Sequence, residues 1–254
     1  MTAEIKINIG SGPTKWVGWI NYDEVTCEGV TPLVLSPNVI LPLDSNSVSI
    51  AYCSHTFEHL PDATVSRILD EVWRVMSADG IFVLKFPDFD WFLDQYRKGN
   101  YKAMIGVGTE STSWSLASKG VEDSLENRVS AYFCGYWNKQ YGDHFSGAIN
   151  KTKEAYLGPA VINDNDLKSI LDNQSPHQIS KTLTNIVKSD PDFKCFSHQN
   201  AWSVTEMSSI LKEKRFLLES TDKEEIVSRY NNIIPRFKEM LGFSAYYLIK
   251  KDSN

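Results

Sequence analysis

The sequence lacks any run of basic residues that could follow a phosphate backbone, and its formal net charge is −6. Nucleic acid is therefore not expected as a partner. It also lacks an apolar run approaching the roughly 18 residues that span a bilayer. Its first residues, MTAEIKINIG, do not have the charged and then apolar segments of a secretion signal. We therefore expect a cytoplasmic protein that does not use a membrane as a partner.

Cysteine is scarce and scattered along the chain. Cys27, Cys53, Cys134 and Cys195 form no C-x-x-C pair, which argues against a zinc knuckle or a redox dithiol. Reduced and mostly buried thiols are expected instead. Internal repeats and low-complexity tracts are absent too, and a hydrophobic content of 42% is typical of globular proteins. The 254 residues should form one large domain, or one domain that carries an insertion.

What is present begins with short apolar or β-branched segments, separated by Gly, Pro, Asn and Asp, as in the buried strands of a parallel sheet. They occupy residues 5–9, 19–22, 48–53 and 81–86. Between the last two, residues 61–80 repeat apolar side chains at helical spacing and end at Gly80. This pattern predicts a strand, a helix and a strand in succession.

The C-terminal part of the chain completes the predicted sheet. Ser203 and Glu206 stand at capping-box spacing and predict the start of a helix. Two strand-like segments follow, at residues 216–219 and 243–251.

The middle of the chain, from Asp88 to about Asn200, has a helical and aromatic-rich pattern. It is clearest at Leu125, Val129, Tyr132, Phe133, Tyr136 and Trp137, and weaker helices are expected near 164–173 and 177–188. We predict an inserted helical cap over residues 91–197 that binds the substrate, and a second domain made of residues 1–90 and 198–254. Aromatic residues at this spacing more often form a core than a ligand site, although a cap above a sheet edge would cover a site there.

A glycine turn follows the first predicted strand. The segment Gly10-Ser11-Gly12 allows the backbone to close on a ligand and to present N–H groups to a carboxylate or phosphate. Asp23 ends the next strand, where an acid can accept hydrogen bonds from two ribose hydroxyls. In a dinucleotide site this acid comes about 20 residues after the glycines, but here it comes much sooner. Together these features fit an adenosine-containing ligand.

Four segments in order resemble the class I S-adenosylmethionine-dependent methyltransferases. They are INIGSGPTKWVGWINYDEV, LPLDSNSVSIAYCSHTFEHLPD, ILDEVWRVMSADGIFVLKFPDFD and HQNAWSVTEMSSILKEKRF. More narrowly, they are similar to a bacterial subgroup with L-N-L-G-C-G-x(n)-G-W-I-N-V-D, then S-H-V-L-E-H, then R-V-L-K-P-G-G. The resemblance covers residues 5–90 and 198–250.

The resemblance implies an α/β fold with a Rossmann-like class I methyltransferase sheet, mostly parallel with an antiparallel C-terminal strand, and here a helical insertion. It implies S-adenosyl-L-methionine as the cofactor, which has no pyrophosphate, so a brief turn can replace the long first helix. Carried over by position, Gly10, Ser11 and Gly12 would line the methionine part and Asp23 the ribose. Ser54 and His55 would lie on the cofactor's other flank.

The implied reaction moves the sulfonium methyl group to an oxygen or nitrogen of a small-molecule acceptor, such as a sugar or a secondary metabolite. His144 and His198 are candidate general bases because imidazole titrates near neutral pH. Asp88 and Asp90 follow the strand predicted at residues 81–86, at the edge where open α/β sheets present catalytic groups. One of them could orient a substrate hydroxyl and the other could cap the next helix. We rank Asp88 first for catalysis.

Two alternatives stay open. HTFEH, residues 55–59, fits the H-x-x-E-H pattern of inverted zinc peptidases, although Pro61 would break the helix that the pattern needs. The bland interpretation is that Glu58 and His59 form a hydrogen-bonded pair that secures the loop below the cofactor. A non-catalytic scaffold with the same fold is the other alternative, because Ser36-Pro37 stands where the subgroup usually has Asp-Leu near the adenine.

Overall fold

The computed structural model describes residues 4–100, 129, 133, 164–188, 198–237 and 242–252. The chain divides by its contacts into two compact units, Met1–Pro87 with Thr205–Asn254, and Asp88–Val204. The predicted division into residues 1–90 with 198–254 and residues 91–197 stays a prediction. The cofactor-binding role of the first unit and the cap role of the second remain predictions.

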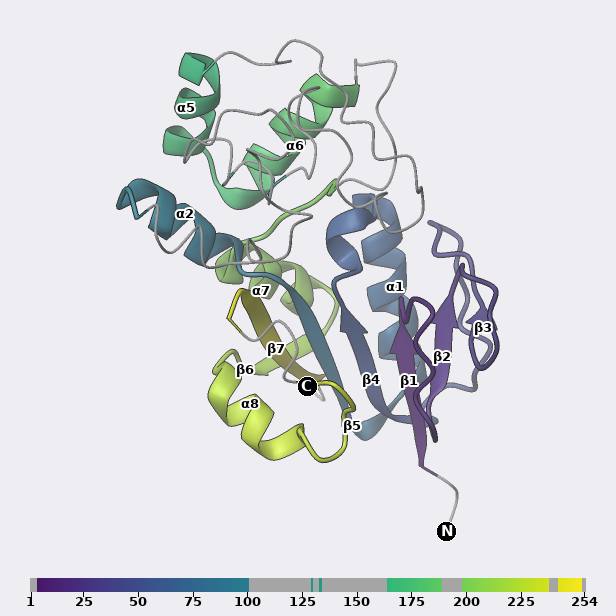
Figure 1. The fold of residues 1–254 in the computed structure, drawn as a ribbon. Coiled ribbons are helices and arrows are strands. Elements are labelled where there is room, and N and C mark those ends of the chain that lie inside the picture. The colour runs from purple at the N-terminus through teal and green to yellow at the C-terminus, as the bar shows by residue number, and fades with distance from the viewer. Residues whose placement is uncertain are drawn as a thin grey trace. The chain divides into compact units, whose positions relative to one another are not determined.

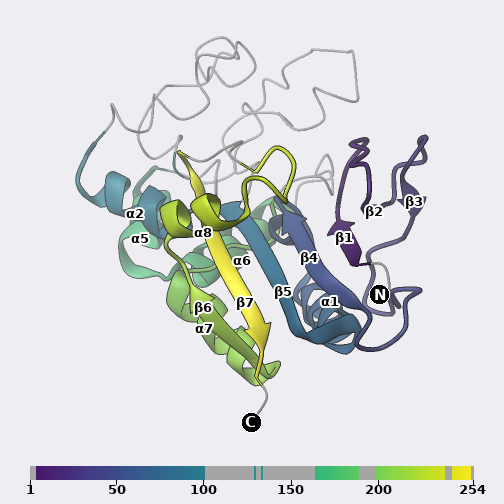
Figure 2. The same ribbon diagram turned by 90° about the horizontal axis from the view of Figure 1, so that it is seen from below.

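In the described part of the chain, seven strands form one sheet in the order β3-β2-β1-β4-β5-β7-β6 (Figures 1 and 2). Neighbouring strands are parallel except where β7 takes part, since β7 is antiparallel to both β5 and β6. The expected class I methyltransferase type of sheet is therefore confirmed. The strands are β1 (Ile5–Ile9), β2 (Ile20–Asp23), β3 (Thr31–Pro32), β4 (Val48–Ser54), β5 (Met76–Pro87), β6 (Phe216–Ser220) and β7 (Ser244–Lys251).

Different helices cover the two faces of this sheet (Figures 1 and 2). On one face lie α1 (Asp62–Val75) and α7 (Val204–Glu213), which bury apolar side chains such as Leu69 and Leu211. On the other face lies α8 (Lys223–Tyr230), whose Ile226 belongs to a core cluster with Tyr52 of β4 and Leu248 of β7. Successive side chains of a strand point to opposite faces, so Cys53 belongs to the first face. Its thiol and that of half-buried Cys27 are free.

The second unit contains the helices that the sequence predicts near 164–173 and 177–188. The structure shows α2 (Phe89–Arg97), α5 (Asp164–Asn173) and α6 (Pro176–Lys188). Val129 and Phe133 are buried, and the Phe133 ring lies 5.2 Å from that of Phe89, which supports core packing. The other aromatic residues of the predicted helix lie outside the described residues. None of the helices described here has both the length and the apolar character that crossing a bilayer requires.

The sequence predicted that the first helix ends at Gly80, and this prediction is wrong. The helix α1 ends at Val75, and β5 begins at the next residue. Val48 of β4 pairs with Met76, whereas Ile50 pairs with Ile81, so the extra residues of β5 form an irregularity between the two pairs. A Cβ atom at Gly80 would lie 2.8 Å from the Val48 carbonyl oxygen. The close approach of two strands, a tertiary constraint, therefore requires this glycine.

A buried glutamate of α1 holds the segment that precedes β4. Glu71 Oε2 accepts the Leu41 N–H at 2.9 Å and Arg74 Nη2 at 2.6 Å, and Oε1 lies 3.1 Å from Arg67 Nη2. Arg74 Nη2 and Nη1 donate in turn to the carbonyl oxygens of Leu41 and Leu43, each at 2.8 Å. Side chains of one helix therefore fix a segment that lacks regular secondary structure.

Acid should weaken this cluster. Burial by itself raises the pKa of Glu71, but hydrogen bonds from Arg74 and from the Leu41 N–H, with the charges of Arg74 and Arg67, outweigh it and hold the pKa below its ordinary value. Such a carboxylate stabilises the fold above its unfolded-state pKa of about 4.3 and loses this effect as the pH falls through the folded-state pKa. Glu71→Gln should therefore lower the free energy of unfolding by about 2 kcal/mol at neutral pH.

Urea denaturation from about pH 7 to about pH 3 measures this effect. The difference in the free energy of unfolding between wild type and Glu71→Gln should shrink as the pH falls below the pKa of the carboxyl group in the unfolded state. Glu213→Gln, a change at an exposed glutamate of α7, serves as the control. A difference that stays constant over the whole range would contradict the assigned role of Glu71.

Candidate functional site

The turn after β1 and the end of β2 lie at the same edge of the sheet. The two strands are parallel, and Ile9 pairs with Tyr22, so Gly10 and Asp23 follow at the same level. Gly10 and Ser11 donate their backbone N–H groups to the Tyr22 carbonyl oxygen at 2.9 and 3.1 Å. The glycine turn is therefore closed onto the neighbouring strand.

The Asp23 carboxylate also closes this turn. Oδ2 accepts the Gly12 N–H at 2.7 Å, and Oδ1 accepts the Val25 N–H at 2.9 Å. Each carboxylate oxygen has a second lone pair, so both can accept a further hydrogen bond from a ligand hydroxyl. Asp23 is half-buried and does not line the pocket described next. The sequence-based assignment of Asp23 to a ribose therefore stays a prediction.

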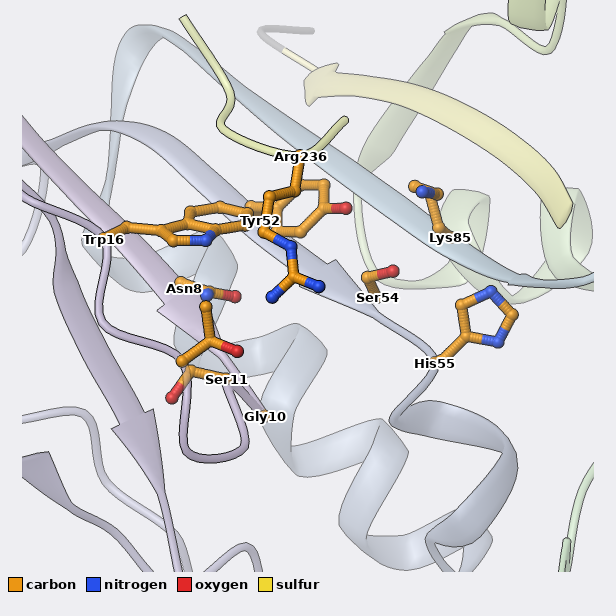
Figure 3. Close-up of a pocket in the computed structure, with 10 residues that line it drawn as sticks. Asn8, Gly10, Ser11, Trp16, Tyr52, Ser54, His55, Lys85 and Arg236 are labelled. Atoms are coloured by element: carbon orange, nitrogen blue, oxygen red, sulfur yellow. The ribbon is translucent and has the colours of Figure 1, made fainter. Parts of the chain in front are cut away.

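A pocket of about 220 Å³ lies beside the turn, at the carboxyl ends of β1 and β4 (Figure 3). Whole drug-sized ligands usually occupy roughly 300–1,000 Å³, so this pocket has room for one end of such a molecule. Four of the predicted cofactor residues line it: Gly10, Ser11, Ser54 and His55. Gly12 does not line it, and its N–H group is directed to Asp23.

Position 10 requires a glycine, because there is no room for a side chain. It has a φ of +71°, and a Cβ atom there would overlap the side chain of Thr56. Thr56 follows β4 and donates its hydroxyl to the Ser54 carbonyl oxygen at 3.2 Å. The turn after β1 can thus pack directly against the loop after β4.

His55 is held at both of its ring nitrogens. Nδ1 lies 3.1 Å from Oε1 of Glu58, which is fully buried, and Nε2 lies 2.8 Å from the Ser244 Oγ. The Nδ1 contact has the distance of an ion pair but not the geometry of a hydrogen bond. The backbone of His55 is left-handed, with a φ of 50°, a strained conformation that surrounding contacts must maintain.

The H-x-x-E-H segment does not adopt the helix that zinc ligation by His55 and His59 would use. Only Phe57–His59 form a helical turn, the 3-10 helix η1, and His55 lies before it. The two histidines therefore do not share a helix face, and both nitrogens of His55 contact protein side chains. This geometry argues against a zinc site formed by His55 and His59, and the hydrogen-bonded pair of Glu58 and His59 stays a prediction.

The second unit contains the described candidates for catalysis. Asp88 caps α2, since its Oδ1 accepts the Trp91 N–H at 3.0 Å. Asp90, which the sequence analysis ranked lower, accepts the Val204 N–H at 2.7 Å. The helix cap therefore belongs to Asp88, and the catalytic role ranked first for this residue stays a prediction.

The two candidate histidines differ in what the structure shows. His198 is buried, with 3% of its surface exposed, and its ring meets that of Phe89 edge-on at 6.3 Å. His144 lies outside the described residues. A general base must reach a substrate proton, so the burial of His198 is a structural argument for packing.

Sequence analysis missed the other residues that line the pocket: Asn8, Thr14, Trp16, Tyr52, Lys85 and Arg236. For Lys85 a signal existed, because a lysine inside the apolar run FVLKFP is unusual for a buried strand. Arg236 stands in a polar segment without a motif. Residues this far apart in sequence meet only through the fold, so no local pattern identifies them as a group.

Lys85 is buried in β5, with 2% of its surface exposed. Its Nζ donates to the Phe237 carbonyl oxygen at 3.3 Å and lies 4.6 Å from the centre of the Tyr246 ring. The Tyr246 hydroxyl donates to the same carbonyl at 2.9 Å, and burial raises the pKa of Tyr246 to about 12. Lys85 and Tyr246 therefore anchor the segment that carries Phe237 and its neighbour Arg236.

One family model matches the chain, that of a methyltransferase domain, over residues 23–84. Among curated proteins nothing matches. The family match and the strand order of the sheet support methyl transfer and indicate S-adenosylmethionine as the cofactor. The matched residues include Asp23, Ser54 and His55, but neither the glycine turn nor Arg236.

Several solved structures are similar in part. PKMT2 from Rickettsia typhi, in complex with AdoHcy, is 8% identical with a TM-score of 0.42, covering 99% of this chain and 49% of that one. An S-adenosylmethionine-dependent methyltransferase from Mesorhizobium loti is 10% identical with a TM-score of 0.39, covering 98% and 90%. This chain thus spans about half the length of the Rickettsia protein. At these identities and TM-scores, the alignments bear on neither substrate nor mechanism.

Adding a methyl group at Gly10 should damage the site more than adding one at Gly12. Both residues have positive φ, but a Cβ atom at Gly12 would meet nothing within 4 Å. Gly12→Ala should therefore cost only the conformational penalty, about 1 kcal/mol of unfolding free energy. Gly10→Ala adds the overlap with Thr56 and should cost about 3 kcal/mol in total.

Denaturant unfolding of the two variants checks this difference. Thr56→Ala in the Gly10→Ala background should recover part of the loss, because it removes the overlapping hydroxyl and methyl groups. Equal destabilisation by the two glycine substitutions would show that Gly10 and Thr56 are not in close contact.

Proposed function

We propose that this protein transfers the methyl group of S-adenosylmethionine to an oxygen or nitrogen of a small acceptor, such as a sugar or a secondary metabolite. One observation carries the proposal. In a sheet of the class I order, the closed glycine turn, Asp23 and a pocket lined by Ser54 and His55 lie at the same edge. Ligands of open α/β sheets bind at the carboxyl ends of the strands, which is where this pocket lies.

The residues present fit the two ends of this cofactor. The pocket has the size for an amino-acid end, and Gly10 and Ser11 contribute backbone at its wall. Asp23 has lone pairs left for the ribose hydroxyls. When bound, the cofactor supplies an electrophilic methyl group on a sulfonium.

The protein's own part is to position the acceptor, exclude water and, for a hydroxyl acceptor, remove a proton. The hydrogen bond of His55 to Ser244 and its contact with the Glu58 carboxylate hold this residue at the pocket wall. His144 and His198 are the residues proposed as the general base, and Asp88 is proposed to orient a substrate hydroxyl. The cap over residues 91–197 is proposed to supply the acceptor site.

A non-catalytic binding protein is the second candidate. Ser36-Pro37, in place of the subgroup's Asp-Leu, is the observation that favours it. Ser36 here forms a turn, in which its Oγ accepts the Asn38 N–H at 3.3 Å. Tight cofactor binding without turnover on a broad panel of hydroxyl and amine acceptors would support this candidate over the enzyme.

Calorimetry with S-adenosylhomocysteine tests the proposal. The wild type should bind it, and Asp23→Ala should weaken binding by at least about tenfold, as expected for the loss of hydrogen bonds to a charged group. Because Asp23 also closes the glycine turn, the 2′-deoxy analogue is the control ligand. The wild type should bind this analogue more weakly than it binds S-adenosylhomocysteine. The Asp23→Ala variant should bind the two ligands with the same affinity.

Two results would contradict this proposal. Absence of S-adenosylhomocysteine binding by the wild type would refute the function. If the substitution of Asp23 lowers the affinity for both ligands by the same factor, only the ribose contact is refuted.

A further inference from the structure

The pocket beside the glycine turn concentrates positive charge in a protein of net charge −6. Lys85 and Arg236 line it, and no acidic residue does so in the described part of the chain. An ammonium and a guanidinium group are donors only. The group that complements this pocket is therefore anionic and rich in hydrogen-bond acceptors.

Trp16 adds a donor that has no acceptor. Its indole Nε1 is buried, and no atom of the described residues accepts its hydrogen. The residue lines the same pocket and has only 8% of its surface exposed. A buried donor without a partner is costly, so a ligand that brings an acceptor to this wall would satisfy it.

The Arg236 side chain extends into the pocket (Figure 3), whereas the Lys85 ammonium group donates to the Phe237 carbonyl oxygen. Figure 3 shows the guanidinium projecting into the pocket, with Asn8 and Ser11 on one side and Ser54 and His55 on the other. The backbone of Arg236 has a φ of 55°, a conformation that needs support from its surroundings. Lys85 supplies support one residue further on, through the Phe237 carbonyl oxygen, and we regard it as a positioning residue.

We propose that Arg236 binds the α-carboxylate of S-adenosylmethionine, with the Trp16 indole N–H as a second donor. The inference rests on the proposed function. At the amino-acid end of this cofactor the carboxylate is anionic, whereas the α-ammonium and the sulfonium are cations that a guanidinium repels. A charge-assisted hydrogen bond from arginine to a carboxylate is also among the stronger polar contacts. A carboxylate of the acceptor has the same chemistry, and the experiment below separates the two sources.

The experiment compares S-adenosylhomocysteine with 5′-methylthioadenosine, which has the same nucleoside and a thioether but no amino-acid end. Arg236→Gln should raise the Kd of S-adenosylhomocysteine about 10- to 100-fold, the effect of losing a hydrogen bond to a charged group, and leave that of 5′-methylthioadenosine unchanged. Arg236→Lys should recover part of the affinity. Trp16→Phe, which removes the N–H together with the five-membered ring of the indole, should weaken S-adenosylhomocysteine about 2- to 10-fold. Its effect on 5′-methylthioadenosine measures the part of this change that comes from the lost ring.

Arg229→Gln is the matched control. Arg229 lies on α8, pairs with Glu219 at 2.9 Å and does not line the pocket, so both ligands should keep their affinities. Thermal unfolding of each variant verifies that it is folded.

Three outcomes would overturn the inference. If the wild type binds S-adenosylhomocysteine and Arg236→Gln binds it equally well, the carboxylate contact is refuted and the proposed function stands. If that variant keeps its cofactor affinity but shows a raised KM for an acidic acceptor, the arginine belongs to the acceptor's carboxylate. Failure of the wild type to bind S-adenosylhomocysteine refutes the function and the inference together.

Discussion

The whole site depends on the close approach of Gly10 to Thr56. A side chain at Gly10 would overlap Thr56, so only a glycine lets the turn after β1 pack on the loop after β4. The hydrogen bonds from Gly10 and Ser11 to the Tyr22 carbonyl oxygen then join the same turn to β2. Three strand ends thereby converge at one edge, and the pocket is the space that this convergence leaves.

Buried polar pairs hold the irregular segments around that space. Glu58 and Ser244 fix His55, Lys85 and Tyr246 fix the Phe237 carbonyl, and Glu71 fixes the segment before β4. Each contact joins a loop to a strand or helix. It gives the loop a fixed position that the loop's own backbone hydrogen bonds do not provide. A buried charge is tolerated only when it is paired, so these pairs are costly to break and favour a single loop conformation.

The sequence predicted every described strand except β3, and most of the helices, because their signals are local: alternating apolar residues, helical spacing and caps. It misplaced the end of α1, since the role of Gly80 is set by the carbonyl oxygen of Val48 on another strand. It found Ser54 and His55 through a motif. Trp16, Lys85 and Arg236 escaped, because nothing within their own segments indicates that the sheet brings them to one pocket.

The short connection between β1 and β2 explains why the pocket depends on the C-terminal part of the chain. With no helix in that connection, one face of the sheet needs another cover. A row of rings supplies it, from Trp19 and Trp16 through Tyr52 to Phe237 and Tyr246, with successive ring centres 5.1 to 6.0 Å apart. Phe237 comes from the segment after α8, and its neighbour Arg236 therefore enters the pocket. With this short connection, part of the pocket wall comes from residues outside 23–84, the range that matches the family model.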